Sequence, residues 1–152
     1  MATSVFKFNT YLFFKLPAAW WCGVRLKRIT ENTAEVSVTH RWINQNPFQS
    51  MFWAAQGIAA EFSTGVLVLK AIRESDRKVS MLVTNQEGNF YKKATGRVKF
   101  TCDEGEKVTK AIEKSIATQE GQIIYLHSKG VNEEGVVVSD FTFQWSIKVK
   151  VS

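Results

Sequence analysis

The chain has 152 residues, of which 45% are hydrophobic, and its formal net charge is +6. This length fits one domain with a full core, and the apolar content excludes a disordered chain. Cys22 and Cys102 stand far apart without nearby histidines, so we expect reduced thiols rather than a disulfide framework or a zinc site. We therefore predict a single domain over residues 1–152, with no metal and no other cofactor.

The N-terminal segment, residues 1–22, is apolar but interrupted by two lysines and a proline. Bulky aromatic residues stand where a signal peptidase requires small ones, so secretion is not expected. Asn9 to Trp21 reads as a short helix, with Asn9 or Thr10 as its cap. No uninterrupted apolar stretch in the chain is long enough to span a membrane. We predict a cytoplasmic protein.

A hairpin and a long helix follow. Val24 to Ile29 and Ala34 to Thr39 alternate apolar and polar side chains on either side of a Glu-Asn turn, which predicts two antiparallel strands. After a polar loop containing Pro47, residues 48–72 are rich in Ala, Met and Leu and run too long for a strand. This stretch is nearly apolar all round, so we expect a buried central helix.

The second half of the chain predicts four strands and one charged helix. The expected strands are Val79–Thr84, Arg97–Cys102, Ile123–Ser128 and Val136–Val151, with a loop over residues 85–96 and a helix over Glu104–Thr118. This order lacks the strand–helix alternation of a doubly wound sheet. A single antiparallel sheet wrapped around one long apolar helix buries both partners, so we predict an α+β protein with the hotdog fold.

Glu61 is the residue that most strongly suggests chemistry. It is the only charged side chain between Trp42 and Leu69, and it lies midway along the expected buried helix. A buried carboxylate must be hydrogen-bonded, paired or protonated with a raised pKa, and these are the ways in which enzymes prepare a general base or nucleophile. The alternative is that Glu61 reaches solvent or caps a backbone group.

The segments NPFQSMFWAAQGIAAEFSTG and NFYKKATGRVKF resemble the acyl-CoA thioesterase branch of the hotdog superfamily. Asn46 stands where that branch has a loop asparagine, Trp53-Ala54 stands where it has a Gly-Gly pair, and Glu61 stands where it has its catalytic acid. Lys93 occupies a place where proline is usual. Uncharacterised thioesterase-like proteins of the DUF4442 type, with an N-P-F-x-S-M loop and an A-A-E helix, are the most similar.

The resemblance implies thioester hydrolysis. Glu61 would activate water or attack directly, the amides of Trp53 and Ala54 would hold the oxyanion, and Asn46 would orient the carboxylate or water. Thr64, one turn further on, is a candidate helper, and its alternative is an ordinary helix residue. Trp53 in place of glycine narrows the room for a bulky acyl group.

The same resemblance suggests a substrate-binding region and an assembly. The candidate substrate-binding residues are Phe52, Asn85, Lys92, Lys93 and Arg97, with Thr84 as an alternative to Asn85. The three basic residues would lie near the entrance for coenzyme A, or would serve only solubility. We expect a homodimer joined edge to edge, because a hotdog monomer leaves one sheet edge unpaired. A tetramer stays open.

Three functions compete. The first is an acyl-CoA or acyl-carrier thioesterase, and the second is a hotdog module that binds an acyl ligand without turning it over, as Trp53 suggests. The third, nucleic-acid binding through the basic strand residues, is disfavoured, because those residues alternate with the core-facing set and form a solvated sheet face. A serine hydrolase is not expected, because no serine stands in a G-x-S-x-G elbow.

Overall fold

The computed structural model describes residues 2–151. Its helices are α1 (Ala2–Lys15), α2 (Pro17–Trp21), the 3-10 turn η1 (Trp42–Asn44), α3 (Trp53–Ser75) and α4 (Gly105–Thr118). Its strands are β1 (Arg25–Ile29), β2 (Ala34–Thr39), β3 (Val79–Phe90), β4 (Arg97–Cys102), β5 (Gln122–Val131) and β6 (Val137–Val149).

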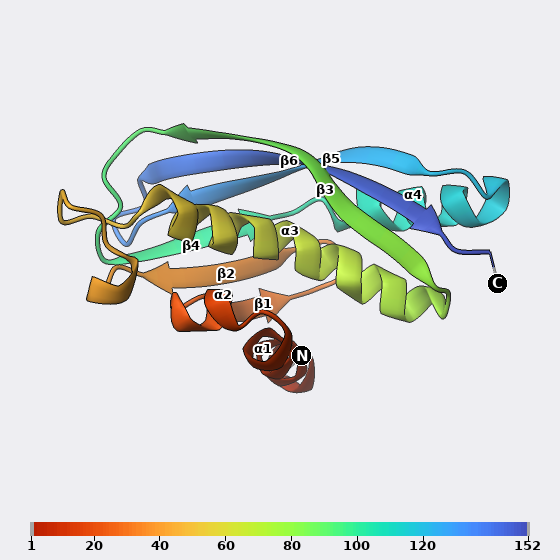
Figure 1. Ribbon diagram of the computed structural model, residues 1–152, viewed down its shortest axis with the longest axis horizontal. Helices are drawn as coiled ribbons and strands as arrows, with labels where there is room; N and C mark the ends of the chain where they lie inside the picture. Colours follow the sequence, from red (N-terminus) through yellow and green to blue (C-terminus); the bar gives the residue numbers. More distant parts are fainter. Residues whose placement is uncertain (1, 152) are drawn as a thin grey trace.

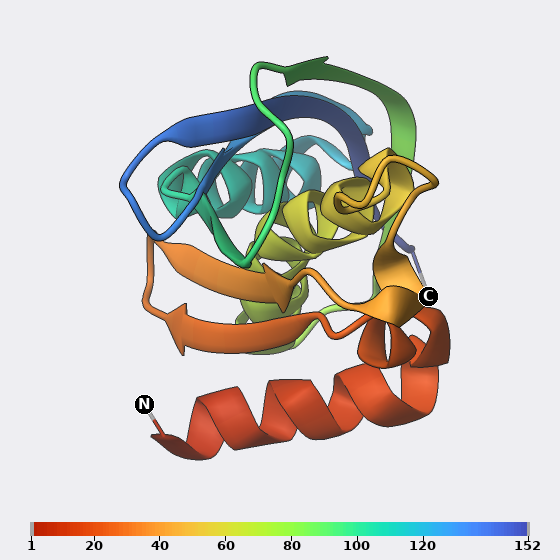
Figure 2. The same ribbon diagram turned by 90° about the vertical axis from the view of Figure 1, so that its left-hand side faces the viewer.

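The strands form one antiparallel sheet in the order β1-β2-β4-β5-β6-β3. The sheet curls around α3, which lies between the β1–β2 hairpin on one side and β5, β6 and β3 on the other (Figure 1, Figure 2). Helix α4 packs beside the C-terminal part of α3, and α1 lies along the outside of β1. The predicted α+β class and hotdog architecture are thereby confirmed.

Helix α3 forms because its alanines and leucines favour helix, and it is buried because its surface is apolar on nearly every side. Between Ala59 and Val68, every residue except Glu61 is buried. By length and composition α3 could cross a membrane, but 61% of its apolar window lies buried inside the protein, as in a core helix. The helix ends where Asp76 takes a left-handed backbone conformation (φ 53°).

The start predicted for this helix was wrong by five residues. Residues 48–52 form a turn instead, in which Gln49 has a positive φ of 60°. The turn is held because the Asn46 side chain accepts hydrogen bonds from the N–H groups of Phe48 (2.9 Å) and Ser50 (3.3 Å). Such local side-chain bonding competes with helix, so α3 begins only at Trp53.

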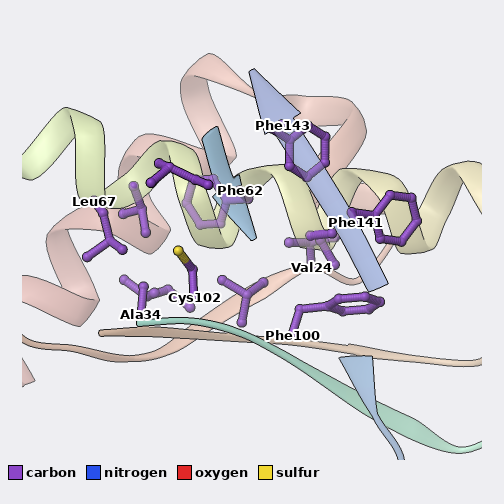
Figure 3. Packing of buried hydrophobic residues seen from close by; sticks show 14 of the residues in the cluster. Val24, Ala34, Phe62, Leu67, Phe100, Cys102, Phe141 and Phe143 are labelled. Atoms are coloured by element: carbon purple, nitrogen blue, oxygen red, sulfur yellow. The ribbon is translucent and has the colours of Figure 1, made fainter. Parts of the chain in front are cut away.

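The core lies between α3 and the sheet. Phe62 and Leu67 of α3 pack over Ala34, Phe100 and Cys102 of β2 and β4 (Figure 3). Strand β6 alternates as predicted, because its inward side chains are buried and its outward ones are partly exposed. These inward side chains are Phe141, Phe143, Trp145, Ile147 and Val149. Val151, expected on the same face, lies beyond the strand and is exposed.

The N-terminal segment is helical, but the predicted cap was wrong. Helix α1 begins at Ala2, and Asn9 lies in its middle. The Asn9 amide instead exchanges two hydrogen bonds with the backbone of Leu26, at 2.9 and 3.0 Å, which satisfies a group on the sheet-edge strand β1. Pro17 cannot continue α1, so it begins α2 at the first helical position, where proline is favoured.

Strand β3 is twice as long as the predicted strand Val79–Thr84. Its second half, from Asn85 to Phe90, pairs with β6 although the sequence there reads as a polar loop. An edge strand tolerates such polar residues because one of its faces is solvated. At Gly88, an added Cβ would lie 2.8 Å from the Phe141 ring, so only glycine fits there. The position therefore has no apolar side chain, and the alternation that would have revealed the strand is missing.

Candidate active site

The first half of α3 presents one partly accessible stripe to a cavity. Ala54, Gly57, Ile58 and Glu61 are spaced three and four positions apart, so they share one helix face. All four line a cavity of about 560 Å³, which we name the Glu61 cavity. The helix buries its other faces in the core and therefore fixes the direction of this stripe.

The other walls of the Glu61 cavity come from three parts of the chain. The junction of α1 and α2, residues 15–19, forms one wall, and Trp53, Gln86 and Phe143 contribute to the rest with Phe62. Figure 3 shows Phe62 on α3 and Phe143 on β6. Only Lys15, Glu61 and Gln86 among the lining side chains are polar. The cavity is therefore an apolar space with one carboxyl group.

The Glu61 side chain is half-buried, and its carboxyl group has no stabilising partner. Among the described residues no side chain pairs with it, and desolvation by burial is the cause that raises the pKa of Glu61 above its ordinary value of 4.5. Gly65 leaves it room, because a Cβ there would lie 3.6 Å from Glu61 Oε1 and 3.3 Å from the Trp145 ring. A raised pKa makes the carboxylate a stronger base than an ordinary glutamate.

The N-terminus of α3 opens toward the same cavity. Phe52 precedes the helix and provides no side-chain cap. The amides of Ala55 and Gln56 donate to the Phe52 carbonyl, whereas in the part of the chain that the structure describes the amides of Trp53 and Ala54 have no acceptor. Such free amides, with the helix dipole behind them, favour a developing negative charge on an oxygen.

A second cavity, of about 600 Å³, lies next to the first. It is lined by Asn46, Phe52, Lys92 and Lys93, among others, and we name it the Lys92 cavity. Within the lining of this cavity, Lys93 Nζ lies 6.0 Å from the centre of the Phe48 ring. Trp53 lines both cavities and is 54% exposed, so its indole stands at the boundary between the apolar cavity and the basic one.

Asn46 and Thr64 have structural contacts that account for their side chains. The Asn46 amide is bonded within its own loop and lies in the Lys92 cavity rather than beside Glu61. Thr64 is fully buried, donates to the Glu61 carbonyl at 2.8 Å and accepts from Trp145 Nε1 at 3.0 Å. Neither side chain is free to contact a substrate in this arrangement.

The structure brings Gln86, rather than Asn85, to the Glu61 cavity. Strand β3 contains a bulge at Thr84, so Asn85 pairs with Gln144 and Gln86 pairs with the inward-facing Phe143. Unbroken alternation from Val83 would have directed Asn85 inward, and nothing in the sequence marks the extra residue. Asn85 therefore shares the outer face of the sheet, where it is exposed.

Arg97 also lines neither of the two cavities. It is exposed at the start of β4, where its backbone N–H donates to Glu133 Oε1 at 2.9 Å. Of the predicted site residues, the structure thus groups Trp53, Ala54 and Glu61 in one cavity. It groups Asn46, Phe52, Lys92 and Lys93, with Trp53, in the other. No group of three metal-ligating side chains occurs within residues 2–151.

A long central helix wrapped by a six-stranded antiparallel sheet is the hotdog fold. The chain belongs to the DUF4442 family, a domain of unknown function, whose family model matches residues 6–147. The predicted resemblance is confirmed at this level. A comparison with curated proteins returned no significant match.

Solved structures agree with this fold. A protein of unknown function from Pseudomonas aeruginosa, described as a "Probable Thioesterase", matches with a TM-score of 0.81 and 17% identity over 95% of each chain. A protein of unknown function from Chlorobaculum tepidum gives 0.82 and 17%, covering 95% of this chain and 93% of its own. A thioesterase from Haemophilus influenzae gives 0.74 and 12%, covering 97% and 92%.

Proposed function

We propose that this protein hydrolyses an acyl thioester, carried on coenzyme A or on an acyl carrier, with Glu61 as its general base. The observation that carries the proposal is a desolvated, unpartnered carboxyl group in an apolar cavity that also receives the uncapped N-terminus of its own helix. Burying such a group is costly unless it is used. The thioesterase descriptions of similarly folded proteins support the same reaction class.

Helix geometry sets how far Glu61 lies from a carbonyl held at the start of α3. Ala54 and Glu61 are seven residues apart, which corresponds to about 10 Å along the helix axis. Side chains tilt toward the helix N-terminus, so the carboxylate stands roughly 6–8 Å from the free amides. A carbonyl held by the amides takes up roughly 4 Å of this span. The remainder admits direct attack by the carboxylate as well as attack through one water molecule, and our proposal takes the second.

In this mechanism the thioester carbonyl oxygen accepts hydrogen bonds from the amides of Trp53 and Ala54. The Glu61 carboxylate takes a proton from the bridging water, which attacks the carbonyl carbon and forms a tetrahedral oxyanion. Collapse of this intermediate breaks the C–S bond, releases the thiolate and leaves a carboxylic acid. Asn46 positions the helix start through its loop, and Thr64 fixes the turn that carries Glu61.

The Lys92 cavity supplies the place for the carrier. Coenzyme A presents phosphates, and Lys92 and Lys93 are exposed cations at this cavity. Because Trp53 borders both cavities, a bound thioester passes the indole with its acyl part in the Glu61 cavity and its phosphates beside the lysines. Phe52, Asn85 and Arg97 were predicted to bind substrate as well, and of these only Phe52 lines the cavity.

Substitution of the acid tests the proposal. Glu61→Gln keeps the shape of the side chain but removes the base, so thioester hydrolysis, measured by thiol release over a panel of acyl-CoA substrates, falls about a hundredfold or more. Glu113→Gln, an exposed glutamate on α4, is the matched control and keeps full activity. A Glu61→Gln protein that keeps its activity but melts several degrees lower would show that the carboxyl group is structural.

The second candidate is a hotdog module that binds an acyl ligand without hydrolysing it. Trp53 favours it, because a large indole stands where thioesterases of the resembling branch have glycine. In this case the wild-type protein binds acyl-CoA but releases no thiol from any substrate of the panel. Our proposal also places the protein in the cytoplasm as a homodimer.

A further inference from the structure

The junction of α1 and α2 is an unusual wall for the Glu61 cavity. It consists of Lys15, Leu16, Pro17, Ala18 and Ala19, and we call it the elbow. Both views place α2 on the same side of the molecule as the first turns of α3 (Figure 1, Figure 2). Pro17 separates the two helices and so fixes the elbow against the cavity.

The elbow and the α3 stripe line the same part of the Glu61 cavity, which we call the slot. Both present small side chains to it. Ala18 and Ala19 on the elbow are matched by Ala54 and Gly57 on the helix. Gly57 has room to spare, since a Cβ there would lie 3.7 Å from the Phe141 ring, an ordinary contact. A glycine inside a helix costs stability relative to alanine, so its presence where alanine would fit keeps the slot wide.

The slot is apolar. Beyond Glu61, only Gln86 and Lys15 offer polar side chains, so a hydroxylated or charged acyl group would be desolvated with few partners. These features favour an aliphatic acyl chain.

We infer that the elbow, through Ala18, sets the longest aliphatic acyl chain that the Glu61 cavity accepts. This inference rests on the proposed function for its reaction, and on the cavity alone for its binding. Ala18 is exposed whereas Ala19 is 5% exposed and belongs to the core. Ala18 can therefore be enlarged without overpacking the interior, whereas Ala19 cannot.

Binding of thioether analogues tests the inference independently of hydrolysis. Affinities of butyl-, octyl-, dodecyl- and hexadecyl-CoA thioethers are measured by calorimetry for the wild type and for Ala18→Phe. In the wild type, affinity rises by up to about fourfold for each added methylene until the chain reaches the elbow, and then levels off. In Ala18→Phe it levels off at a shorter chain, so the longest thioether loses about tenfold while the butyl thioether is unchanged.

Two further variants complete the design. Ala117→Phe places the same new ring on an exposed alanine of α4 that lines neither cavity, and it keeps the wild-type profile. Gly57→Ala narrows the slot from the opposite wall by one methyl group and shortens the preferred chain by less than Ala18→Phe does.

The outcomes separate the inference from the proposed function. Affinity that does not depend on chain length, or an Ala18→Phe profile identical to that of Ala117→Phe, would overturn the inference. If the thioethers follow the expected profile while no acyl-CoA thioester is hydrolysed, the inference holds and the proposed hydrolysis fails. A shortened profile for hydrolysis as well as for binding supports both.

Discussion

At the scale of single residues, Glu61 lowers the stability of the folded protein. From Ala59 to Val68 it alone escapes full burial, and its carboxyl group faces an apolar cavity without a partner among the described side chains. A glutamine or leucine at this position would avoid the cost of desolvating a charge. Sites that violate ordinary burial rules in this way are typical of function rather than of stability.

The raised pKa of Glu61 makes a prediction about stability and pH. Its folded-state pKa lies above the unfolded one, so the native state holds the proton more tightly, and the associated stability is present below the unfolded pKa. That stability is lost as the pH rises through the folded pKa. Glu61→Gln therefore unfolds like the wild type near pH 4 but is more stable than the wild type at pH 8.

Urea unfolding of both proteins across this range measures the difference. Hydrolysis by the wild type should follow the opposite trend, since kcat/KM rises with pH as the carboxylate forms, with a midpoint above the ordinary value for a glutamate. A stability difference independent of pH would mean that Glu61 finds a partner in solution.

The amide of Ala54 can be removed with little damage to the fold. Proline is tolerated in the first turn of a helix, where its missing N–H has no intrahelical acceptor. Ala54→Pro should therefore fold normally but lower kcat by about a hundredfold or more, the loss seen when one oxyanion donor is removed. Ala54→Gly keeps the N–H and serves as the control in the same thiol-release assay. Equal activity of the two variants would exclude this amide from the oxyanion site.

At the scale of elements, the segment after β3 joins the two cavities. Strand β3 brings Gln86 to the Glu61 cavity, and the chain that leaves it carries Lys92 and Lys93 to the neighbouring one. The backbone of this segment is fixed, because the amides of Tyr91 and Lys92 donate to the Val138 carbonyl and the Met51 amide donates to the Ala94 carbonyl. The lysines thus stand on a defined wall rather than on a free loop.

Replacement of both lysines tests whether this wall binds coenzyme A. Lys92→Ala/Lys93→Ala should weaken binding of an acyl-CoA by about tenfold at low salt and flatten its dependence on ionic strength, because two screened attractions to phosphate are lost. Lys110→Ala/Lys114→Ala on α4 changes the net charge equally at a distance from both cavities. Affinity unchanged at low salt in the first variant would leave the lysines a role in solubility only.

At the scale of the whole molecule, the two edges of the sheet differ. Helix α1 lies along β1 and covers that edge, whereas no described segment pairs with the outer edge of the twelve-residue strand β3. An open edge of this length is a template for another strand. Together with Leu82, which is 64% exposed on β3, it favours pairing with a second copy of the chain.

We expect light scattering of the wild type at micromolar concentration to give the mass of a dimer. Leu82→Lys places a charge on the edge strand, where it repels its symmetry mate, and should shift the protein toward the monomer. Ile123→Lys introduces the same charge on the outer face of β5, away from the edge, and should leave the dimer intact. A wild-type monomer would contradict the assembly.

The sequence by itself determined the elements whose burial follows a simple period. The apolar surface of α3, which extends nearly all round the helix, and the two-residue alternation of β6 each require a partner layer, and a single sheet around a single helix satisfies both. The same reasoning isolated Glu61, because one charge in a long apolar segment is visible without a structure. Propensity and burial act locally, so the local sequence records them.

Only the tertiary structure decided what surrounds that acid. Because of the bulge at Thr84, Gln86 rather than Asn85 lies at the cavity. The polar second half of β3 forms a strand because β6 offers it a pairing partner. The elbow reaches the cavity because Asn9 ties α1 to Leu26 of β1, a contact between residues seventeen positions apart. Such register shifts and long-range contacts depend on which backbone groups happen to be unsatisfied nearby, and no local pattern in the chain encodes them.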